Sequence, residues 1–312
     1  MLQRSNTLVS LCVCTFRRPQ LALTLGSLAE LQTVEGMTFE IVIADNDLTQ
    51  SAAPIAKSFA ATAPWPVVYV HAPSENISLA RNACLEAASG RYLAFIDDDE
   101  TAAPDWIVEL MSVMQRENAA AVLGPVQAVY EETAPAWMQG NAVHSTFPVF
   151  VKGQIETGYT CNVLLDRGSE AVDRLRFNLA SGKTGGEDTE YFTRLRKAGG
   201  TIGYAPAAWV HEPVPASRAS MSWLAKRRFR MGQTHGRLLR ENGVGRITGI
   251  ATAAAKVGAC LGLAANTLHS PAGWRRNALR GLLHAGTISG LLGLREIVQY
   301  GAAQPKDIAD AA

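Results

Sequence analysis

The most informative stretch of the chain is Tyr92-Leu93-Ala94-Phe95-Ile96-Asp97-Asp98-Asp99. Its first five residues are apolar and partly aromatic, which is typical of a short strand buried on both faces. Three carboxylates follow at once, and two like charges about 4 Å apart repel by roughly 1 kcal/mol even in water. Such a cluster either raises its own pKa values or binds a cation. The alternative is a solvated acidic turn before the helix start at Pro104-Asp105-Trp106.

Metal binding is the more specific interpretation of these acids. Ligands of open α/β sheets lie at the carboxyl ends of the strands, which is where the acids fall. Carboxylate oxygens suit Mg²⁺ or Mn²⁺, and these ions take further ligands from water and substrate phosphates. The sequence therefore predicts a divalent-metal site at the end of this strand.

Strands and helices alternate through the first half of the chain. The predicted strands are Leu8–Cys14, Phe39–Ala44, Val67–Val70 and Tyr92–Ile96, and the predicted helices begin near Pro19, Ala52 and Ser78, the last one stopping at Gly90. This order predicts right-handed parallel crossovers, and hence an α/β fold with a mostly parallel central sheet flanked by helices. Asp45, at the end of the second strand, is expected at the same edge as Asp97.

The second half is less regular. We expect a helix over Trp106–Gln115, a strand over Ala121–Val129, a short strand over Val163–Leu165, and a strand over Thr201–Ala205. Residues 130–158 lack a clear pattern, and such stretches commonly carry substrate-specific loops.

A glycine pair opens the helix that starts with Gly185-Gly186-Glu187-Asp188. Acids in a first turn are ordinary helix design, because they face the positive end of the helix dipole. Paired glycines, however, let a backbone approach a ligand closely, and the dipole favours an ionised Asp188 that can accept a proton. His211 follows the last predicted strand, and a lone histidine there is more often structural than a ligand.

Composition sets wide limits. The chain has 312 residues, 47% of them hydrophobic, and a formal net charge of +1, so it can bury a full core and has no overall preference for a charged partner. Its five cysteines lack Cys-x-x-Cys spacing and are predicted to be reduced core residues of a cytoplasmic protein. No signal peptide is expected, because a strand-like run begins by Leu8.

Two nucleotide-binding classes are disfavoured. No Gly-x-Gly-x-x-Gly fingerprint follows the first strand, and no Gly-x-x-x-x-Gly-Lys-Ser/Thr loop occurs. A dinucleotide oxidoreductase and a P-loop phosphotransferase are therefore poor fits, whereas a nucleotide site built from acids and a metal remains.

Taken in order, these motifs resemble the inverting family 2 glycosyltransferases, which have the glycosyltransferase-A-type nucleotide-diphospho-sugar fold. The resemblance covers roughly residues 7 to 235, and it is strongest to the bacterial exopolysaccharide subgroup of succinoglycan-type glucosyltransferases. Its motifs are the opening strand and turn at 9–19, the acids at 45–47, Leu79-Ala80-Arg81-Asn82, the Asp-x-Asp at 97–99, the Glu187-Asp188 pair and the His211-Glu212-Pro213 run. The Gln-x-x-Arg-Trp signature of processive synthases is missing, so we expect one sugar per binding event.

The resemblance implies a role for each site residue. It places the nucleotide-sugar, most simply a UDP-sugar, on Thr15, Arg17, Asp45, Arg81, Asp97 and Asp98. It assigns Mg²⁺ or Mn²⁺ to Asp99 and His211, and it makes Asp188 the general base that gives inversion. Glu187, Trp137 and Asn162 are expected on the acceptor side, where a saccharide or lipid-linked saccharide would bind.

The expected domains are a catalytic domain over 1–217, with a donor half at about 1–125 and an acceptor half at about 126–217, and a helical region over 218–312. Between Arg218 and Arg246 there are eight Lys or Arg residues and one acid, and 247–268 is apolar with Lys256 as its one charge. Both flanks of this apolar segment are basic, which disfavours a span and favours helices lying in the cytoplasmic interface of the inner membrane. The alternative is a helical pack against the catalytic domain or against a second copy in a homo-oligomer.

Three other functions fit the sequence less well than a glycosyltransferase. A sugar nucleotidyltransferase on a related fold would want a glycine-rich basic loop after the first strand, and only Arg17-Arg18 stand there. A non-catalytic saccharide-binding or scaffold subunit need not keep Asp99, Asp188 and His211. Nucleic-acid binding is not expected, since no recognisable module accompanies the basic stretch.

Overall fold

A computed structural model of the chain describes residues 7–183 and 185–297. Its strands are β1 (Thr7–Thr15), β2 (Met37–Asp45), β3 (Val67–His71), β4 (Tyr92–Asp97), β5 (Thr101–Ala102), β6 (Ala121–Leu123), β7 (Val126–Tyr130), β8 (Phe150–Val151), β9 (Gln154–Ile155), β10 (Asn162–Asp166), β11 (Ile202–Tyr204) and β12 (Val210–Val214). Its helices are α1 (Leu21–Ala29), α2 (Ala53–Ala60), α3 (Ile77–Ala87), α4 (Trp106–Glu117), α5 (Glu170–Asp173), the 3₁₀ turn η1 (Leu179–Ser181), α6 (Glu187–Lys197), α7 (Met221–Glu241), α8 (Arg246–Asn266) and α9 (Pro271–Leu292).

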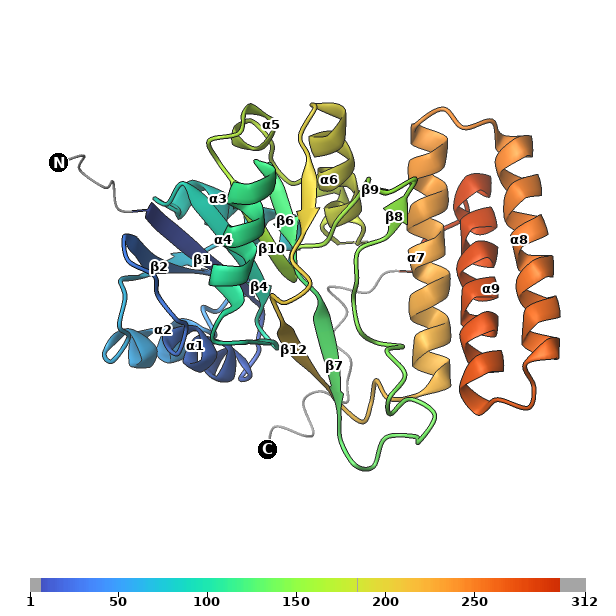
Figure 1. Cartoon of the computed structure of the whole chain (residues 1–312), viewed down its shortest axis with the longest axis horizontal. Coiled ribbons are helices and arrows are strands. Elements are labelled where there is room, and N and C mark those ends of the chain that lie inside the picture. Colours follow the sequence, from blue (N-terminus) through green and yellow to red (C-terminus); the bar gives the residue numbers. More distant parts are fainter. Residues whose placement is uncertain (1–6, 184, 298–312) are drawn as a thin grey trace.

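The central sheet has the order β11-β6-β10-β4-β1-β2-β3. Within this described sheet every strand runs in the same direction except β10, which is antiparallel to β4 and β6. The predicted α/β architecture with a mostly parallel sheet is confirmed. A smaller sheet, β5-β12-β7, continues below it, and the C-terminal helices stand to one side (Figure 1).

Helices cover both faces of the central sheet. Apolar side chains of α1, α2 and α4 pack on one face, and those of α3, α5 and α6 pack on the other. Leu21, Leu25 and Leu28 of α1 are fully buried, as their helical spacing predicts. The strands themselves are buried on both sides, which explains their continuous apolar runs.

Two local predictions are wrong. The strand expected over Ala121–Val129 is broken into β6 and β7, which belong to different sheets. The break falls at Gly124-Pro125, since proline cannot donate to a ladder and a Cβ at Gly124 would collide with the Asn162 side chain. The cap of α3 is Asn76 instead of Ser78, because the Asn76 side chain accepts a hydrogen bond from Ser78 N (3.1 Å).

The three C-terminal helices contact the rest of the chain through a separate apolar cluster. Met138 and Val214 pack there with Leu224 of α7 and Leu279 of α9. The predicted boundary between residues 217 and 218 lies just before α7. All five cysteines are free thiols, in agreement with the prediction that they are reduced.

Candidate active site

Three neighbouring parallel strands bring their carboxyl ends to one edge of the sheet. In the register, Thr15 of β1 pairs with Asp45 of β2, and Cys14 pairs with Asp97 of β4. The prediction that the two acidic strand ends share an edge is therefore confirmed. Chemistry-bearing side chains from sequence positions far apart meet at this edge.

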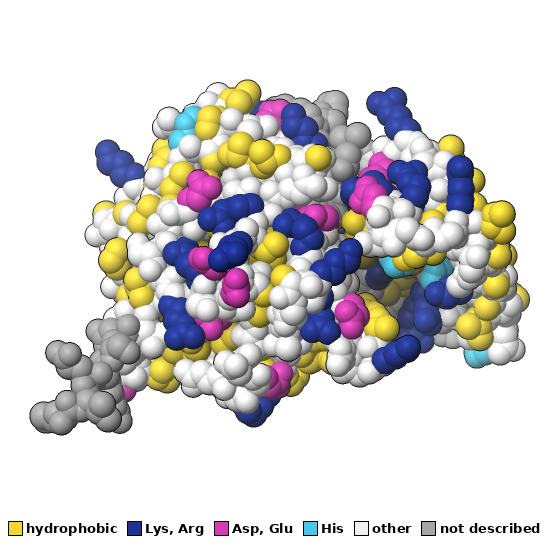
Figure 2. All heavy atoms as spheres, turned by 90° about the horizontal axis from the view of Figure 1, so that it is seen from above, with side chains coloured by type: hydrophobic (Ala, Val, Ile, Leu, Met, Phe, Trp, Pro, Cys, Tyr) yellow, Lys and Arg dark blue, Asp and Glu magenta, His cyan; other side chains and the backbone are white. Residues whose placement is uncertain are grey.

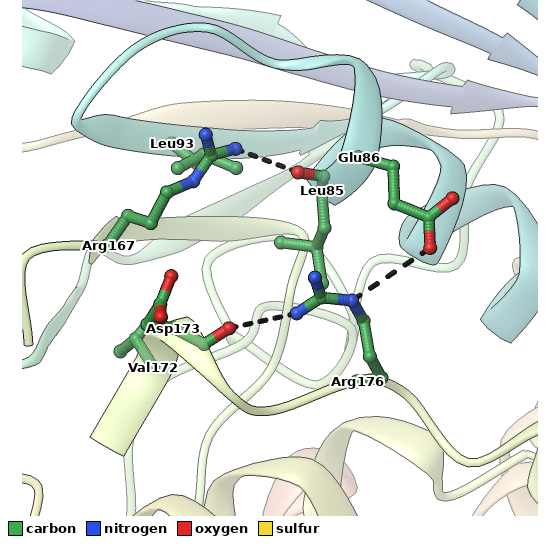
Figure 3. Close-up of a pocket in the computed structure, with 7 residues that line it drawn as sticks. All are labelled: Leu85, Glu86, Leu93, Arg167, Val172, Asp173 and Arg176. Carbon is green, nitrogen blue, oxygen red and sulfur yellow. Dashed lines mark hydrogen bonds and ion pairs between the residues drawn. The ribbon is translucent and has the colours of Figure 1, made fainter. Parts of the chain in front are cut away.

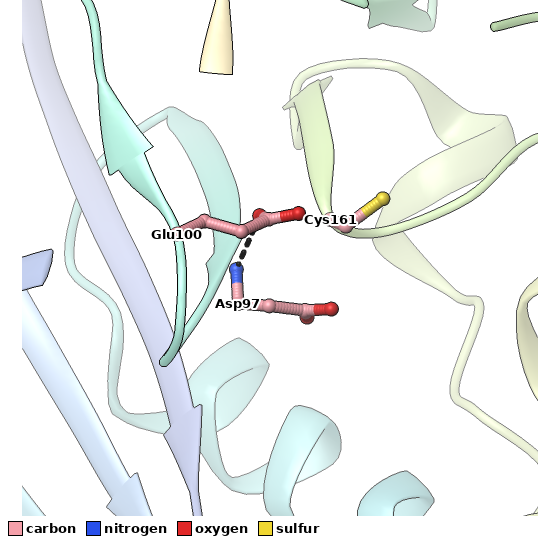
Figure 4. A group of neighbouring side chains, drawn as sticks. All are labelled: Asp97, Glu100 and Cys161. Carbon is pink, nitrogen blue, oxygen red and sulfur yellow. Dashed lines mark hydrogen bonds between the residues drawn. The ribbon is translucent and has the colours of Figure 1, made fainter. Parts of the chain in front are cut away.

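An acidic cluster lies just beyond β4. Single ligand atoms of Asp97, Glu100 and Cys161 lie within 4.8 Å of one another, and Figure 4 shows the three side chains together. Glu100 Oε2 also accepts a hydrogen bond from Asp97 N (3.0 Å). Burial raises the pKa of Asp97 to about 6, and it raises that of Glu100 well above its usual range. The charge of Glu212 on β12 adds to both shifts.

Two arginines approach the outer acids of the cluster. Asp99 Oδ2 lies 3.4 Å from Arg18 Nη1 and 3.6 Å from Arg218 Nη1, and Arg218 Nη1 also lies 3.4 Å from Glu212 Oε1. Asp98 accepts a hydrogen bond from Phe16 N, and its burial raises its pKa to about 7, with Asp99 adding to the shift. Acids and arginines are thus interleaved at the end of the sheet.

The donor set of this cluster fits a hard divalent cation. Burial raises the pKa values of Asp97, Asp98 and Glu100, and the charges of neighbouring carboxylates add to the shifts, as expected where acids gather in one place. Carboxylate oxygens are the preferred ligands of Mg²⁺ and Mn²⁺. Cys161 is the poor member of the set, because burial raises the pKa of its thiol and keeps it protonated.

A buried ion-pair network forms the other half of the site. Arg81 Nη1 of α3 donates to Glu187 Oε1 and to Asp188 Oδ1 of α6, each at 2.6 Å. Thr160 Oγ1 also donates to Asp188 Oδ1 (3.0 Å), and Thr160 N donates to its Oδ2 (3.3 Å). Burial raises the pKa of Asp188 to about 7, although Arg81 opposes the shift. The charge of Asp97 adds to it, so both halves of the site share one electrostatic environment.

The start of α6 explains why Asp188 points where it does. Gly185 and Gly186 have φ values of 84° and 90°, a left-handed region that favours glycine. A Cβ on Gly186 would also collide with the side chain of Thr234 on α7. The glycine pair therefore turns the chain sharply and places Glu187 and Asp188 in the first turn, facing α3.

Arg81, which the resemblance assigns to the nucleotide-sugar, is paired with Glu187 and Asp188 in the structure. It is 6% exposed, and the two carboxylates raise its pKa above the usual value even though burial lowers it. Its guanidinium stacks near the Phe177 ring, 5.5 Å from the centroid. In this structure Arg81 lies behind Asp188 and holds it in place.

Asp45 is buried and fully bonded inside the protein. Its carboxylate accepts hydrogen bonds from Tyr69 Oη (2.8 Å), Ala52 N (2.9 Å) and Asp47 N (3.0 Å), so it anchors the start of α2. Arg17 donates instead to Asp47 Oδ1 (3.0 Å) from a half-exposed position. Thr15 is buried at the end of β1, next to the turn that bonds Asp98.

The residues expected on the acceptor side lie in different parts of the structure. Asn162 is completely buried. Its Nδ2 donates to Pro125 O and Ala208 O, and its Oδ1 accepts from Trp106 Nε1, so its side chain links three parts of the protein. Trp137 packs beside the C-terminal helices, and the Arg275 guanidinium lies 5.1 Å from its ring centroid.

His211 lies on β12, paired with Thr101 of β5. Among the described residues, no hydrogen bond or ion pair joins its ring to Asp97, Asp99 or Glu100. Its neighbour Glu212 is the β12 residue whose charge acts on the cluster.

Sequence reasoning missed five contributors to the site: Arg18, Glu100, Thr160, Glu212 and Arg218. Glu100 directly follows the three aspartates and could have been included with them. Arg18 follows Arg17 and Glu212 follows His211 in motifs already singled out, so these two could have been included as well. Thr160 and Arg218 reach the site through long-range packing, for which the local pattern gives no signal.

A hollow of about 280 Å³ lies away from this edge, lined by Leu85, Glu86, Leu93, Arg167, Val172, Asp173 and Arg176 (Figure 3). Its arginines are used structurally. Arg167 donates to Leu85 O and Ala88 O at the end of α3, and Arg176 donates to Asp173 O. The hollow is at the amino end of β4, so it takes no part in the acidic site.

Comparison with known proteins identifies the family. The sequence model described as Glycosyl transferase family 2 matches residues 10–169. The chain is also 52% identical over 296 residues to the succinoglycan biosynthesis protein ExoM of Rhizobium meliloti (strain 1021), covering 94% of this chain and 96% of that protein. The chain belongs to glycosyl transferase family 2. The resemblance predicted from the motifs is confirmed, and this family 2 member is a glycosyltransferase.

Solved structures support the glycosyltransferase-A-type fold of this family 2 enzyme. A mannosyltransferase from Pyrobaculum calidifontis, solved with GDP-Man and Mn²⁺, has a TM-score of 0.62 at 18% identity and covers 92% of this chain and 88% of its own. GalNAc-T7, solved with UDP, GalNAc and Mn²⁺, has a TM-score of 0.55 at 13% identity and covers 70% of this chain and 46% of its own. At these identities the likeness concerns the fold alone.

Proposed function

We propose that this glycosyltransferase transfers one sugar, with inversion, from a UDP-sugar to a saccharide or lipid-linked saccharide in bacterial exopolysaccharide synthesis. The observation that carries the proposal is the partly buried Asp188 carboxylate, held by Arg81 and Thr160 beside the acidic edge. The high identity to a succinoglycan biosynthesis protein supports the pathway. The location that follows is the cytoplasm, at the inner face of the membrane.

Asp97 and Asp99, together with Glu100, would hold Mg²⁺ or Mn²⁺ at the end of β4. The neighbouring structures solved with nucleotides and Mn²⁺ support this choice. When bound, the ion would neutralise charge on the nucleotide diphosphate. His211, which lies on β12 next to Glu212, remains our proposal for a further ligand.

Arg18 and Arg218 would bind the phosphates directly. Both guanidiniums already lie within 3.6 Å of Asp99, so a diphosphate at this edge would meet two cations as well as the acids. Guanidinium pairs phosphate oxygens in a fixed bidentate geometry, which orients the leaving group. Asp98, Thr15 and Arg17 lie at the same edge and would contact the nucleotide.

Asp188 would accept the proton of the acceptor hydroxyl, and Glu187 would stay paired with Arg81. A carboxylate with its ordinary pKa is a weak base near neutral pH. Burial raises the pKa of Asp188 to about 7, which makes this carboxylate a stronger base. Only the ionised form accepts a proton. We therefore expect the transfer rate to fall about tenfold per pH unit below about pH 7, measured as initial rate across pH 5.5 to 8.5 at saturating donor. A rate that stays constant down to pH 5.5 would contradict this role.

Thr160 is expected to position this base without touching substrate. In Thr160→Val the hydroxyl that stabilises the ionised carboxylate is lost, so the pKa of Asp188 rises further and the acidic limb of the rate profile moves to higher pH. Loss of one hydrogen bond predicts a roughly fivefold lower kcat at pH 7. Thr160→Ser should restore both quantities, whereas a merely structural effect would lower the melting temperature and leave the pH profile in place.

The proposal is tested by a donor and acceptor screen with Mn²⁺. UDP-glucose, UDP-galactose, UDP-GlcNAc and GDP-mannose are each compared for binding by calorimetry and for transfer to lipid-linked saccharides. We expect one donor to bind and to yield a product lengthened by one sugar. Donor binding with no transfer to any acceptor would favour a saccharide-binding subunit, and formation of a sugar nucleotide from a nucleoside triphosphate would favour a nucleotidyltransferase.

A further inference from the structure

The three C-terminal helices form a layer in which α9 lies between α7 and α8 (Figure 1). The α7–α9 contact is backbone to backbone, since a Cβ on Gly232 would collide with Leu283 O and one on Gly286 would collide with Phe229 O. The α8–α9 contact is looser, with Cys260 Cβ 3.4 Å from the position of a Cβ on Gly281. Figure 2 shows a hollow in this helical part, and this hollow is called the groove below.

Four basic or titratable side chains from these three helices lie close enough for their charges to interact: His235 of α7, Lys256 of α8, and Arg280 and His284 of α9. Lys256 stands on the α9 side of its helix, between the buried residues Ala253 and Cys260. Desolvation lowers the pKa of both histidines, and the positive charge of Lys256 lowers both further. The charges of Arg280 and His235 lower the pKa of His284 in the same way, so positive charge gathers in this part of the three helices.

No acidic residue of these three helices neutralises the positive charge of the groove. The sequence of α7 holds six Lys or Arg residues, that of α8 two and that of α9 three, whereas Glu241 is the one acid in all three. Glu241 pairs with Arg237, and so does Glu296. Figure 2 shows Lys and Arg side chains gathered in a hollow of the helical part, with His side chains beside it and hydrophobic side chains outside it.

The outer face of α8 is apolar and uncovered. Ile247 is 86% exposed and Leu261 is 60% exposed, and a Cβ on Gly258 or Gly262 would meet nothing within 4 Å. By length and composition α8 is the one described helix that could cross a membrane. It packs along α9, however, and a span would draw Arg275 and Arg280 of that helix toward the hydrocarbon, which is expensive.

We propose that the groove binds the phosphate groups of an anionic lipid surface, with the outer face of α8 lying in the boundary between headgroups and acyl chains. A cationic groove beside an uncharged apolar face is the pattern of an interfacial helix on an anionic membrane. This proposal rests on the proposed function, which supplies the lipid-linked acceptor. Binding to the lipid surface would place the active site where such an acceptor lies. Lipid headgroups and free phosphates offer the groove the same phosphate chemistry. The proposal commits to the lipid headgroup as the group that binds.

The test is co-sedimentation of the full chain with vesicles of phosphatidylcholine alone or with 30% phosphatidylglycerol added, a composition chosen for the probe. We expect binding to the anionic vesicles only. Each basic residue near such a surface contributes about fivefold, so Lys256→Glu/Arg280→Glu should weaken binding by more than tenfold. Ile247→Ser/Leu261→Ser should weaken it independently. The matched control is Lys57→Glu/Arg174→Glu, which makes the same change in net charge at exposed sites of α2 and after α5, and should bind like the parent.

Three outcomes would overturn the proposal: equal binding to both vesicle types, unchanged binding by the groove variant, or vesicle binding abolished by millimolar inorganic pyrophosphate at an ionic strength where sodium sulfate has no effect. A stable dimer that dissociates in Ile247→Ser/Leu261→Ser, with no lipid binding by the parent, would also overturn it. Sugar transfer assayed in detergent separates the lipid-binding proposal from the proposed glycosyltransferase function. Loss of vesicle binding with intact transfer defeats only the lipid site, and Asp188→Asn should lose transfer while binding vesicles like the parent.

Discussion

Asp188→Asn is expected to retain donor binding and to lose transfer by about a hundred- to ten-thousand-fold, the range of general-base catalysis. The amide keeps the shape of the side chain and can still accept from Thr160, but it cannot take a proton from the acceptor. The measurement is single-turnover transfer with saturating donor, alongside calorimetry of the donor.

A matched control accompanies this variant. Asp173→Asn removes an exposed carboxylate at the end of α5, far from the acidic edge, and should transfer like the parent. If Asp188→Asn also turned over like the parent, the base would have to be another residue. Loss of donor binding together with transfer would show instead that Asp188 acts on the donor side.

Arg81→Met is expected to destabilise the fold by about 3–5 kcal/mol, the usual effect of removing one partner from a buried ion pair. Glu187 is 6% exposed and the side chain of Asp188 beside it is 23% exposed, so both carboxylates would be left without their cation. Urea unfolding at pH 8 measures the loss. Protonation offers partial relief, so the destabilisation should be smaller at pH 6 than at pH 8.

The control for Arg81 is another arginine pair. Arg91 binds Asp166 at 3.0 Å, but its side chain is 62% exposed, so Arg91→Met should change stability by about 1 kcal/mol or less. The double variant Arg81→Met/Glu187→Gln should recover part of the loss. Equal stabilities of Arg81→Met and the parent would mean that the network does not hold the two helices together.

Much of the fold could be predicted because its signals are local. The buried strands Leu8–Cys14 and Tyr92–Ile96 are continuous apolar runs, and each ends where a polar turn begins. The shared edge of Asp45 and Asp97 followed from parallel strand order alone. The acids at 97–99 and the Glu187-Asp188 pair were visible as motifs, and the family comparison confirms the resemblance they carried.

The features that the sequence could not predict share one physical cause, which is contact between residues distant in sequence. Arg81 carries the same charge whether it faces a phosphate or a carboxylate, and only the packing of α3 against α6 directs it to Glu187 and Asp188. Asn162 is polar at the head of a strand, and nothing local shows that it binds Trp106 across 56 residues. Such partners are set by tertiary structure.

The central claim is that acids at the edge of the sheet hold a cation that binds the nucleotide diphosphate. Titration of UDP into the parent protein, with Mn²⁺ and then with EDTA, tests it most directly. We expect binding in Mn²⁺, its loss in EDTA, and at least about tenfold weaker binding in Asp99→Asn, as is typical when a metal site is damaged. UDP affinity that is the same with Mn²⁺, with EDTA and in Asp99→Asn would contradict the account.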